Sequence, residues 1–135
     1  MNVTATAGVV AFVVGTALGA LVPTVLGAQT QIRKVEVSQL MKMDVAGCDG
    51  KEVTVSVIKA GPGTSPTHYH PGQSFTYILE GSQLHETDGN QIQVGVGDAL
   101  YDAPMQVHRT ENTAPVKLLV VRILEKGKQE NVIVQ

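Results

Sequence analysis

The sequence predicts an all-β protein, an antiparallel sandwich or barrel. Short runs of strand-forming residues recur at regular spacing, and each is bounded by Gly, Pro, Asn or Asp. No stretch after the N-terminal leader has a convincing helical pattern of apolar residues. Many short strands separated by tight turns are typical of a sheet that packs against itself.

The predicted strands can be placed one by one. The clearest covers residues 51–60, where Val53, Val55 and Val57 alternate with polar residues and predict a half-buried strand. Residues 88–90, Asp-Gly-Asn, predict a tight hairpin. The other predicted strands are residues 33–37, 75–79, 82–87, 91–96, 99–103, 107–112 and 116–124, with a last edge strand at 131–135. Residues 38–43 fit either one helical turn or an extended arm.

Composition limits the class of protein. The chain has 135 residues and a formal net charge of -2. This length fits one domain, and the absence of a basic stripe argues against a nucleic-acid partner. The single cysteine, Cys48, cannot form an internal disulfide. It lies in a turn-like stretch without other thiols or histidines at ligand spacing, so we interpret it as structural or incidental.

The N-terminal segment differs from the rest of the chain. No charged side chain precedes Arg33, and residues 9–26 are mostly Val, Ala, Leu and Gly. Such a segment is typical of a signal peptide or a membrane anchor. Small residues around Ala28 favour cleavage, whereas the missing N-terminal Lys or Arg and the length of the uncharged stretch favour a retained anchor. A buried core helix is the third and least favoured interpretation.

We therefore divide the chain into three parts. Residues 1–28 are the signal peptide or membrane anchor, residues 29–50 an N-terminal arm, and residues 51–135 the barrel domain. Both interpretations of the leader export the domain. The expected location is periplasmic or extracellular, or anchored to a membrane with the barrel outside the cytoplasm, and the membrane is a partner only if the leader is retained.

Three histidines indicate a metal site. His68 and His70 lie one residue apart on an extended segment, so their side chains point to the same face. His108 lies in another predicted strand, after a turn at Pro104. The three imidazoles could meet only if the sheet folds back on itself, as in a small barrel with a metal inside. The alternative is that they only form hydrogen bonds within the barrel.

The stretches around these histidines resemble the cupin superfamily. Its first motif is similar to residues 61–81, with His-Tyr-His-Pro-Gly at 68–72 and Tyr-Ile-Leu-Glu-Gly at 77–81 as the matching core. Its second motif resembles residues 97–112, with the spacing of the final His and Asn intact. The resemblance covers roughly residues 53–124 and extends to small exported single-domain bacterial cupins. It implies an antiparallel jelly-roll barrel.

The resemblance also implies a divalent metal held by three histidines and one glutamate. His68, His70 and His108 match the histidines, and the metal is Fe, Mn, Ni, Cu or Zn. The glutamate does not carry over, because Ser74 stands at its position, next to Gln73. A serine hydroxyl is neutral and short, so it is a poor ligand. Three neutral imidazoles still bind such an ion and leave an extra open position.

The second motif departs from the family as well. Met105 stands where a Gly is usual, and Ala103 where a Pro is usual.

Other polar residues are candidates for contact with a small-molecule substrate. Strand parity directs Ser74 and Thr76 to the same face as the histidine pair, and Gln73 to the opposite face, although its carbonyl is long enough to reach a metal. Gln83 and His85 stand where related sequences usually have apolar residues, which favours an interior position. A surface position on an edge strand is the alternative for His85.

More than one function fits these residues. The first hypothesis is a metal-dependent dioxygenase or other oxidoreductase acting on a small organic molecule, since some cupin thiol dioxygenases use a three-histidine iron site. The alternatives are a non-catalytic barrel that binds a small ligand or metal, and a non-redox isomerase. No catalytic-triad order, phosphate-binding loop or paired carboxylates support a hydrolase. The resemblance also implies a homodimer, with residues 29–43 as a possible contact arm.

Overall fold

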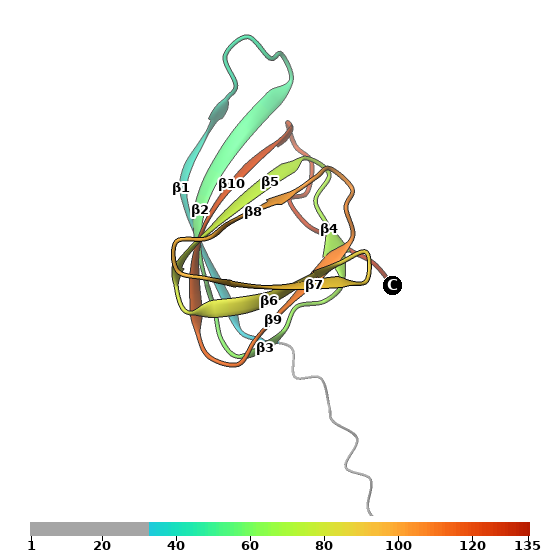
Figure 1. The fold of residues 1–135 in the computed structure, drawn as a ribbon. Coiled ribbons are helices and arrows are strands. Elements are labelled where there is room, and N and C mark those ends of the chain that lie inside the picture. Colours follow the sequence, from blue (N-terminus) through green and yellow to red (C-terminus); the bar gives the residue numbers. More distant parts are fainter. Residues whose placement is uncertain (1–32) are drawn as a thin grey trace, which may run out of the picture.

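The computed structural model describes residues 33–135, which form two antiparallel sheets that curl around a common interior (Figure 1). The strands are β1 (Val35–Asp44), β2 (Lys51–Ala60), β3 (Gly63–Thr64), β4 (His68–Tyr69), β5 (Gln73–Glu80), β6 (Ser82–Thr87), β7 (Asn90–Gly95), β8 (Ala99–Asp102), β9 (His108–Asn112), β10 (Val116–Glu125) and β11 (Val132–Ile133). One sheet has the order β1-β2-β10-β5-β8, and the other has the order β11-β4-β9-β6-β7 with β3 paired to β9. Residues 33–135 contain no helix able to cross a membrane.

The predicted antiparallel all-β fold is confirmed. Strands β2 and β6 coincide with the predicted ranges 51–60 and 82–87, and Thr87 pairs with Asn90 across the predicted hairpin. Residues 38–43 continue β1, so the extended alternative is correct and the helical turn is wrong. The predicted leader, residues 1–28, lies outside the described residues.

Side chains alternate between the interior and the outer surface along the central strands, as the period of two requires. On β10 the inward residues are Val116, Leu118 and Val120, followed by Arg122 and finally Leu124. The first three join a buried apolar core, which also contains Ala60, Ile78 and Val94. The interior therefore changes along the strands from an apolar end to a polar end, and the polar end is where the histidines lie.

Two motif glycines permit close approaches of the backbone. A Cβ added to Gly72 would lie 2.1 Å from the carbonyl oxygen of Ile123. At Gly81, where φ is +78°, an added Cβ would lie 2.6 Å from the carbonyl oxygen of Pro115. Glycine is the residue that tolerates both conditions. Gly72 therefore allows the chain to turn directly after His70 and to enter β5 against β10.

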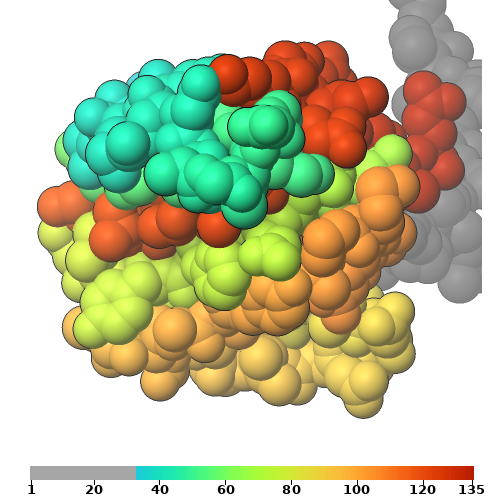
Figure 2. Space-filling model, turned by 90° about the horizontal axis from the view of Figure 1, so that it is seen from above, coloured from blue at the N-terminus to red at the C-terminus, as the bar shows by residue number. Residues whose placement is uncertain are grey.

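The outer face of the five-stranded sheet is unusually apolar. Figure 2 looks onto this sheet, where the bands of β1 and β2, β10, β5 and β8 follow one another. Its exposed large side chains include Met41, Met43, Phe75, Tyr77 and Tyr101. The Phe75 and Tyr101 rings are in contact, with centroids 5.1 Å apart. All ten residues of the edge strand β1 are exposed as well.

Candidate metal centre

The structure brings the three predicted histidines together. His68 lies on β4, His70 follows that strand directly, and His108 opens β9, where it is the register partner of His68. One ring nitrogen from each histidine lies within 4.8 Å of the others. Two strands of one sheet thus place three potential ligand atoms at a single point inside the barrel.

Backbone carbonyls fix the orientation of all three rings. The Nδ1 atom of His68 donates to the carbonyl oxygen of Pro66 at 2.8 Å, and Nδ1 of His70 donates to that of Glu130 at 2.8 Å. Nδ1 of His108 donates to the carbonyl oxygen of Gln106 at 3.0 Å. Since Nδ1 carries the hydrogen in each ring, the Nε2 atoms keep their lone pairs. Metal-binding histidines are typically held in this way.

The surroundings also keep the two histidines of the first motif neutral. Burial, the nearby Arg122 charge and the other histidines lower the pKa of His70 to about 4, although its hydrogen bond to the Glu130 carbonyl opposes this. Burial likewise lowers the pKa of His68, against the effect of the Pro66 carbonyl. Neutral imidazole is the form that binds a metal, so little proton competition is expected near neutral pH.

The histidines open onto a cavity of about 280 Å³ within the barrel. Its apolar wall is formed by Val35, Val37, Ile58, Leu100, Leu118 and Val120. Of the predicted substrate-lining residues, Thr76, Gln83 and His85 line this cavity. Ser74 is fully buried on the inner face of β5, whereas Gln73 is exposed on the outer face and does not reach the cavity. His85 is buried rather than at the surface.

A carboxylate that sequence reasoning missed enters the same cavity. Asp102 is the register partner of Ser74 across β5 and β8, and only 3% of it is exposed. Its Oδ1 lies 3.2 Å from Nε2 of His85, and its Oδ2 lies 3.9 Å from Nε2 of His108. The Oδ1 contact is within ion-pair distance, but the ring N–H does not point well enough for a strong hydrogen bond. The period of two along residues 99–103 could have revealed Asp102, which shares a face with Leu100.

The environment keeps Asp102 ionised. Burial alone would raise the pKa of its carboxyl group, but His85, His108 and His70 together hold this pKa below its ordinary value. Asp102 therefore places a negative charge beside the histidine cluster, and the cavity lining also includes Glu130, Arg33 and Arg122.

Several polar atoms of this cavity have no partner within residues 33–135. Buried atoms without a hydrogen bond include Oε1 of Gln83, Nδ1 of His85 and Oδ1 of Asp102, three residues that line the cavity. Leaving a buried polar atom unpaired costs about 1–3 kcal/mol. Arg122 donates through Nη1 to Oε2 of Glu130 at 2.6 Å, while its Nε is also without a partner among these residues. The unpaired atoms are a reason to expect water or a ligand in the cavity.

Sequence comparison identifies the family. Residues 45–122, more than half of the chain, match the family described as the cupin domain. The chain belongs to the cupin family.

The similar proteins have names that describe different activities. This cupin is 36% identical to the tetracenomycin polyketide synthase protein TcmJ of Streptomyces glaucescens over 66 residues. The aligned region covers 47% of this chain and 44% of that protein. The match thus spans less than half of that relative. Two solved structures share the fold. The DMSP lyase DddQ of Ruegeria pomeroyi has a TM-score of 0.59 at 20% identity, covering 74% of this chain and 51% of that one. The polyketide cyclase RemF of Streptomyces resistomycificus has a TM-score of 0.57 at 22% identity, covering 75% and 72%.

The donor set of this cupin fits a divalent metal ion. Three imidazoles whose Nε2 atoms are not engaged by the backbone are suitable ligands for Zn, Fe, Ni or Cu. Ser74 places a hydroxyl rather than a carboxylate at the remaining family position. Asp102 brings a negative charge nearby, although its oxygens are not part of the cluster formed by the three ring nitrogens.

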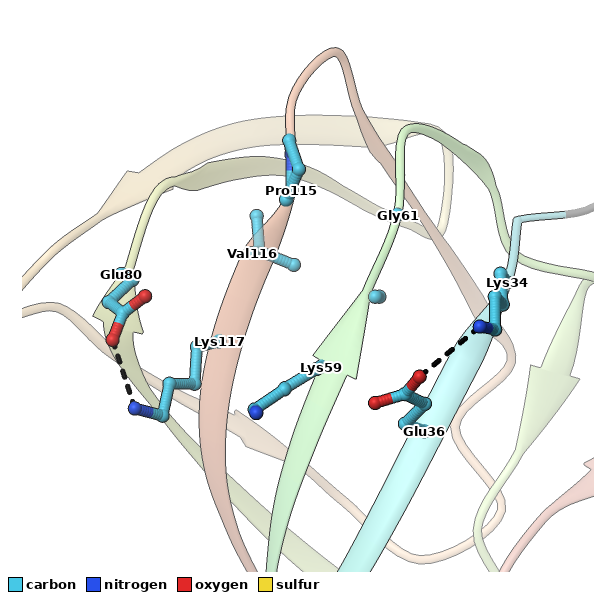
Figure 3. A pocket seen from close by; sticks show the side chains of 9 residues that line it. Lys34, Glu36, Lys59, Gly61, Glu80, Pro115, Val116 and Lys117 are labelled. Carbon is cyan, nitrogen blue, oxygen red and sulfur yellow. Dashed lines mark hydrogen bonds and ion pairs between the residues drawn. The ribbon is translucent and has the colours of Figure 1, made fainter.

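A larger depression, of about 490 Å³, lies on the surface of the barrel (Figure 3). Its charged side chains largely pair with one another, Lys34 with Glu36 at 3.3 Å and Lys117 with Glu80 at 2.9 Å. Lys59 projects between these two pairs in Figure 3. None of the predicted site residues lines this depression. The smaller internal cavity is therefore the candidate site, because it holds the histidines and the unpaired polar atoms.

Proposed function

We propose that this cupin binds a divalent metal through His68, His70 and His108 and acts as a metal-dependent enzyme on a small organic molecule. The observation that carries the proposal is the set of three Nε2 atoms kept free by three backbone carbonyls. When bound there, the ion would supply Lewis-acid chemistry by polarising an oxygen of the substrate. The apolar wall of the cavity would orient the substrate.

We further propose proton transfer as the reaction class, of an isomerase, lyase or cyclase type. The support is the polar pair of His85 and Asp102, which lies beside the histidine cluster and offers a group that can hold or move a proton. Lyase and cyclase also occur among the names of similar proteins. An oxygen-dependent dioxygenase is the second candidate, favoured by a three-histidine donor set with Ser74 at the carboxylate position.

Metal content tests the first proposal. We would purify the protein without a histidine tag and measure bound metals by mass spectrometry, before and after reconstitution. Near-stoichiometric metal is expected in the wild type, and its loss is expected in His68→Ala and His108→Ala. The matched control is His85→Ala, because His85 is a buried histidine of the same cavity outside the ligand cluster, and this change should leave metal content unchanged. A wild-type protein that binds no metal after reconstitution contradicts the proposal.

Oxygen consumption separates the two reaction classes. The metal-loaded protein would be screened against small organic substrates with an oxygen electrode and, in parallel, under anaerobic conditions. Turnover without oxygen is expected from proton transfer and should be lost in His85→Ala, which keeps its metal. Turnover that strictly consumes oxygen would support the dioxygenase. Tight ligand binding without any turnover would instead support the non-catalytic barrel.

We propose that the barrel functions outside the cytoplasm. The support is the uncharged leader before Arg33. Cell fractionation of the full chain and of a chain lacking residues 1–28 tests this. Export of the full chain alone is expected, and the mass of the exported protein would show whether the leader is cleaved. Equal cytoplasmic retention of both chains would contradict it.

We also propose a homodimer formed through the outer face of the five-stranded sheet. The support is the group of exposed apolar side chains on that face, because exposing apolar surface to water is unfavourable and such patches often mark interfaces. Light scattering after size exclusion should show a dimer, and Phe75→Glu should make it monomeric. Ile92→Glu, an exposed apolar residue of β7, is the control that should remain dimeric.

A further inference from the structure

The cavity holds a pair of polar groups whose bonding is incomplete and which the three-histidine centre does not use. Gln83 and His85 lie two residues apart on β6, so they face the same side of the strand. They are 3% and 4% exposed, and both line the cavity. Oε1 of Gln83 and Nδ1 of His85 have no hydrogen-bond partner among residues 33–135. Buried polar atoms in native proteins are nearly always paired, so both groups are expected to bind water or a ligand.

The neighbouring carboxylate determines what His85 offers to that ligand. Oδ1 of Asp102 lies 3.2 Å from Nε2 of His85, and an ionised carboxylate can only accept a hydrogen bond. Two lone pairs would repel each other at this distance, so Nε2 carries the ring hydrogen. When this is the ring's one hydrogen, Nδ1 is a hydrogen-bond acceptor. Asp102 is thus a positioning residue that fixes the tautomer of His85.

We propose that Gln83 and His85 form a subsite that binds the hydroxyl group of a small, otherwise apolar molecule: an alcohol, a phenol or an enol. The hydroxyl donates its single hydrogen to Nδ1 of His85. Its oxygen accepts a hydrogen from the NH2 group of Gln83, which a half-turn of the side-chain amide brings to the position of Oε1. The apolar wall, which includes Val37, Leu118 and Val120, contacts the body of the ligand. A cavity of about 280 Å³ limits the ligand to a small molecule.

Other ligand classes match these groups less well. A carboxylate or phosphate at this subsite would meet the acceptor nitrogen of His85 and the nearby charge of Asp102, which repel an anion. Arg33 and Arg122 also line the cavity, but their guanidinium groups already bond to Asn112, Thr110 and Glu130. A wholly apolar molecule would leave the polar atoms unpaired. A hydroxyl suits both groups because it donates and accepts at once. The inference names the substrate class of the enzyme proposed above and in that respect rests on it, but the subsite itself requires no metal.

A pair of fluorinated probes tests the subsite. Fluorine NMR titrations of the full-length protein would compare 4-fluorophenol with its methyl ether, 4-fluoroanisole, which cannot donate a hydrogen bond. The wild type should bind the phenol about tenfold more tightly, as expected for one buried hydrogen bond. His85→Phe should abolish this preference by weakening the phenol while leaving the ether unchanged. Glu86→Gln, the next residue on β6, is the control that should keep the preference.

Further measurements keep the test decisive. If His85→Phe does not fold, Gln83→Met should still reduce the preference, and the wild-type comparison of phenol and ether needs no variant. Equal binding of both probes, binding of neither, or a preference that survives His85→Phe in a folded protein overturns the subsite. The titrations would be repeated after metal removal with a chelator. If the protein binds no metal but still prefers the phenol, the subsite is supported and only the proposed metal centre fails. If it binds metal but shows no preference for the phenol, only the subsite is overturned.

Discussion

Acidification of the metal-depleted protein should reveal the buried state of His70. This side chain is 3% exposed, and its pKa is lowered from 6.5 to about 4. The causes are burial, the charge of Arg122 and the adjacent His108 and His68, against the opposing hydrogen bond to the Glu130 carbonyl. Folding therefore keeps His70 neutral in a pH range where the unfolded chain already binds a proton.

The sign and the size of the effect follow from linkage. Below pH 6.5 the unfolded state binds more protons than the folded state, so the free energy of unfolding decreases as the pH falls towards 4. A difference of about 2.5 between the two pKa values corresponds to about 3 kcal/mol, at 1.36 kcal/mol per pKa unit. The lowered pKa of His68 acts in the same direction. The pKa of Asp102 is lowered from 3.8, so the stability that its ionised form contributes is lost only at pH values below this range of 6.5 to 4.

Urea unfolding measures how the free energy of unfolding depends on pH. The chelator-treated wild type and a His70→Gln variant would be unfolded at several pH values between 7 and 4.5, and their free energies of unfolding compared. The free energy of unfolding of the wild type should fall by most of the expected amount over this pH range. That of His70→Gln should fall much less. The same pH dependence in both proteins would refute the assignment of the effect to His70.

Three further substitutions have defined expectations. Gly72→Ala should destabilise the protein by at least about 2 kcal/mol in urea unfolding, because the new Cβ would lie 2.1 Å from a β10 carbonyl oxygen. The control is Gly95→Ala, whose new Cβ would have its nearest contact at 4.0 Å and should change the stability little. Met105→Gly should stabilise by up to about 1 kcal/mol, since Met105 is exposed and has a φ of 66°; a loss would contradict this. Arg122→Met, which leaves Glu130 without its partner at 2.6 Å, should lower the melting temperature, and an unchanged value would show that the pair contributes nothing.

Much of the fold could be predicted because its signals are local. Alternation in residues 51–60 and the Asp-Gly-Asn turn at 88–90 define β2 and the β6–β7 hairpin without tertiary information. The length of β1 could not be predicted in the same way. Residues 38–43 have no clean alternation, and the register shifts between Gln39 and Met41, which moves the following side chains to the opposite face.

The candidate site was predictable where it depends on motif spacing. His68, His70 and His108 could be grouped from strand parity and family resemblance, and the structure does bring them together. Asp102 escaped because the alternation along residues 99–103 indicates only that it shares a face with Leu100, not that this face meets the histidines. Its place depends on which residue it faces across β5 and β8, and cross-strand register is a tertiary property.

That register explains the unusual serine. Arg122, Ser74 and Asp102 are successive register partners across β10, β5 and β8, all on the inner face. A glutamate in place of Ser74 would lie directly beside the Asp102 carboxylate, and two buried like charges so close cannot both remain ionised without a large cost. Arg122 would not compensate fully, because Glu130 already engages it. Ser74 and Asp102 are therefore one electrostatic arrangement, in which the negative charge of the centre has moved across the strand pair. There it contacts His85, and the three histidine nitrogens remain free to bind a metal.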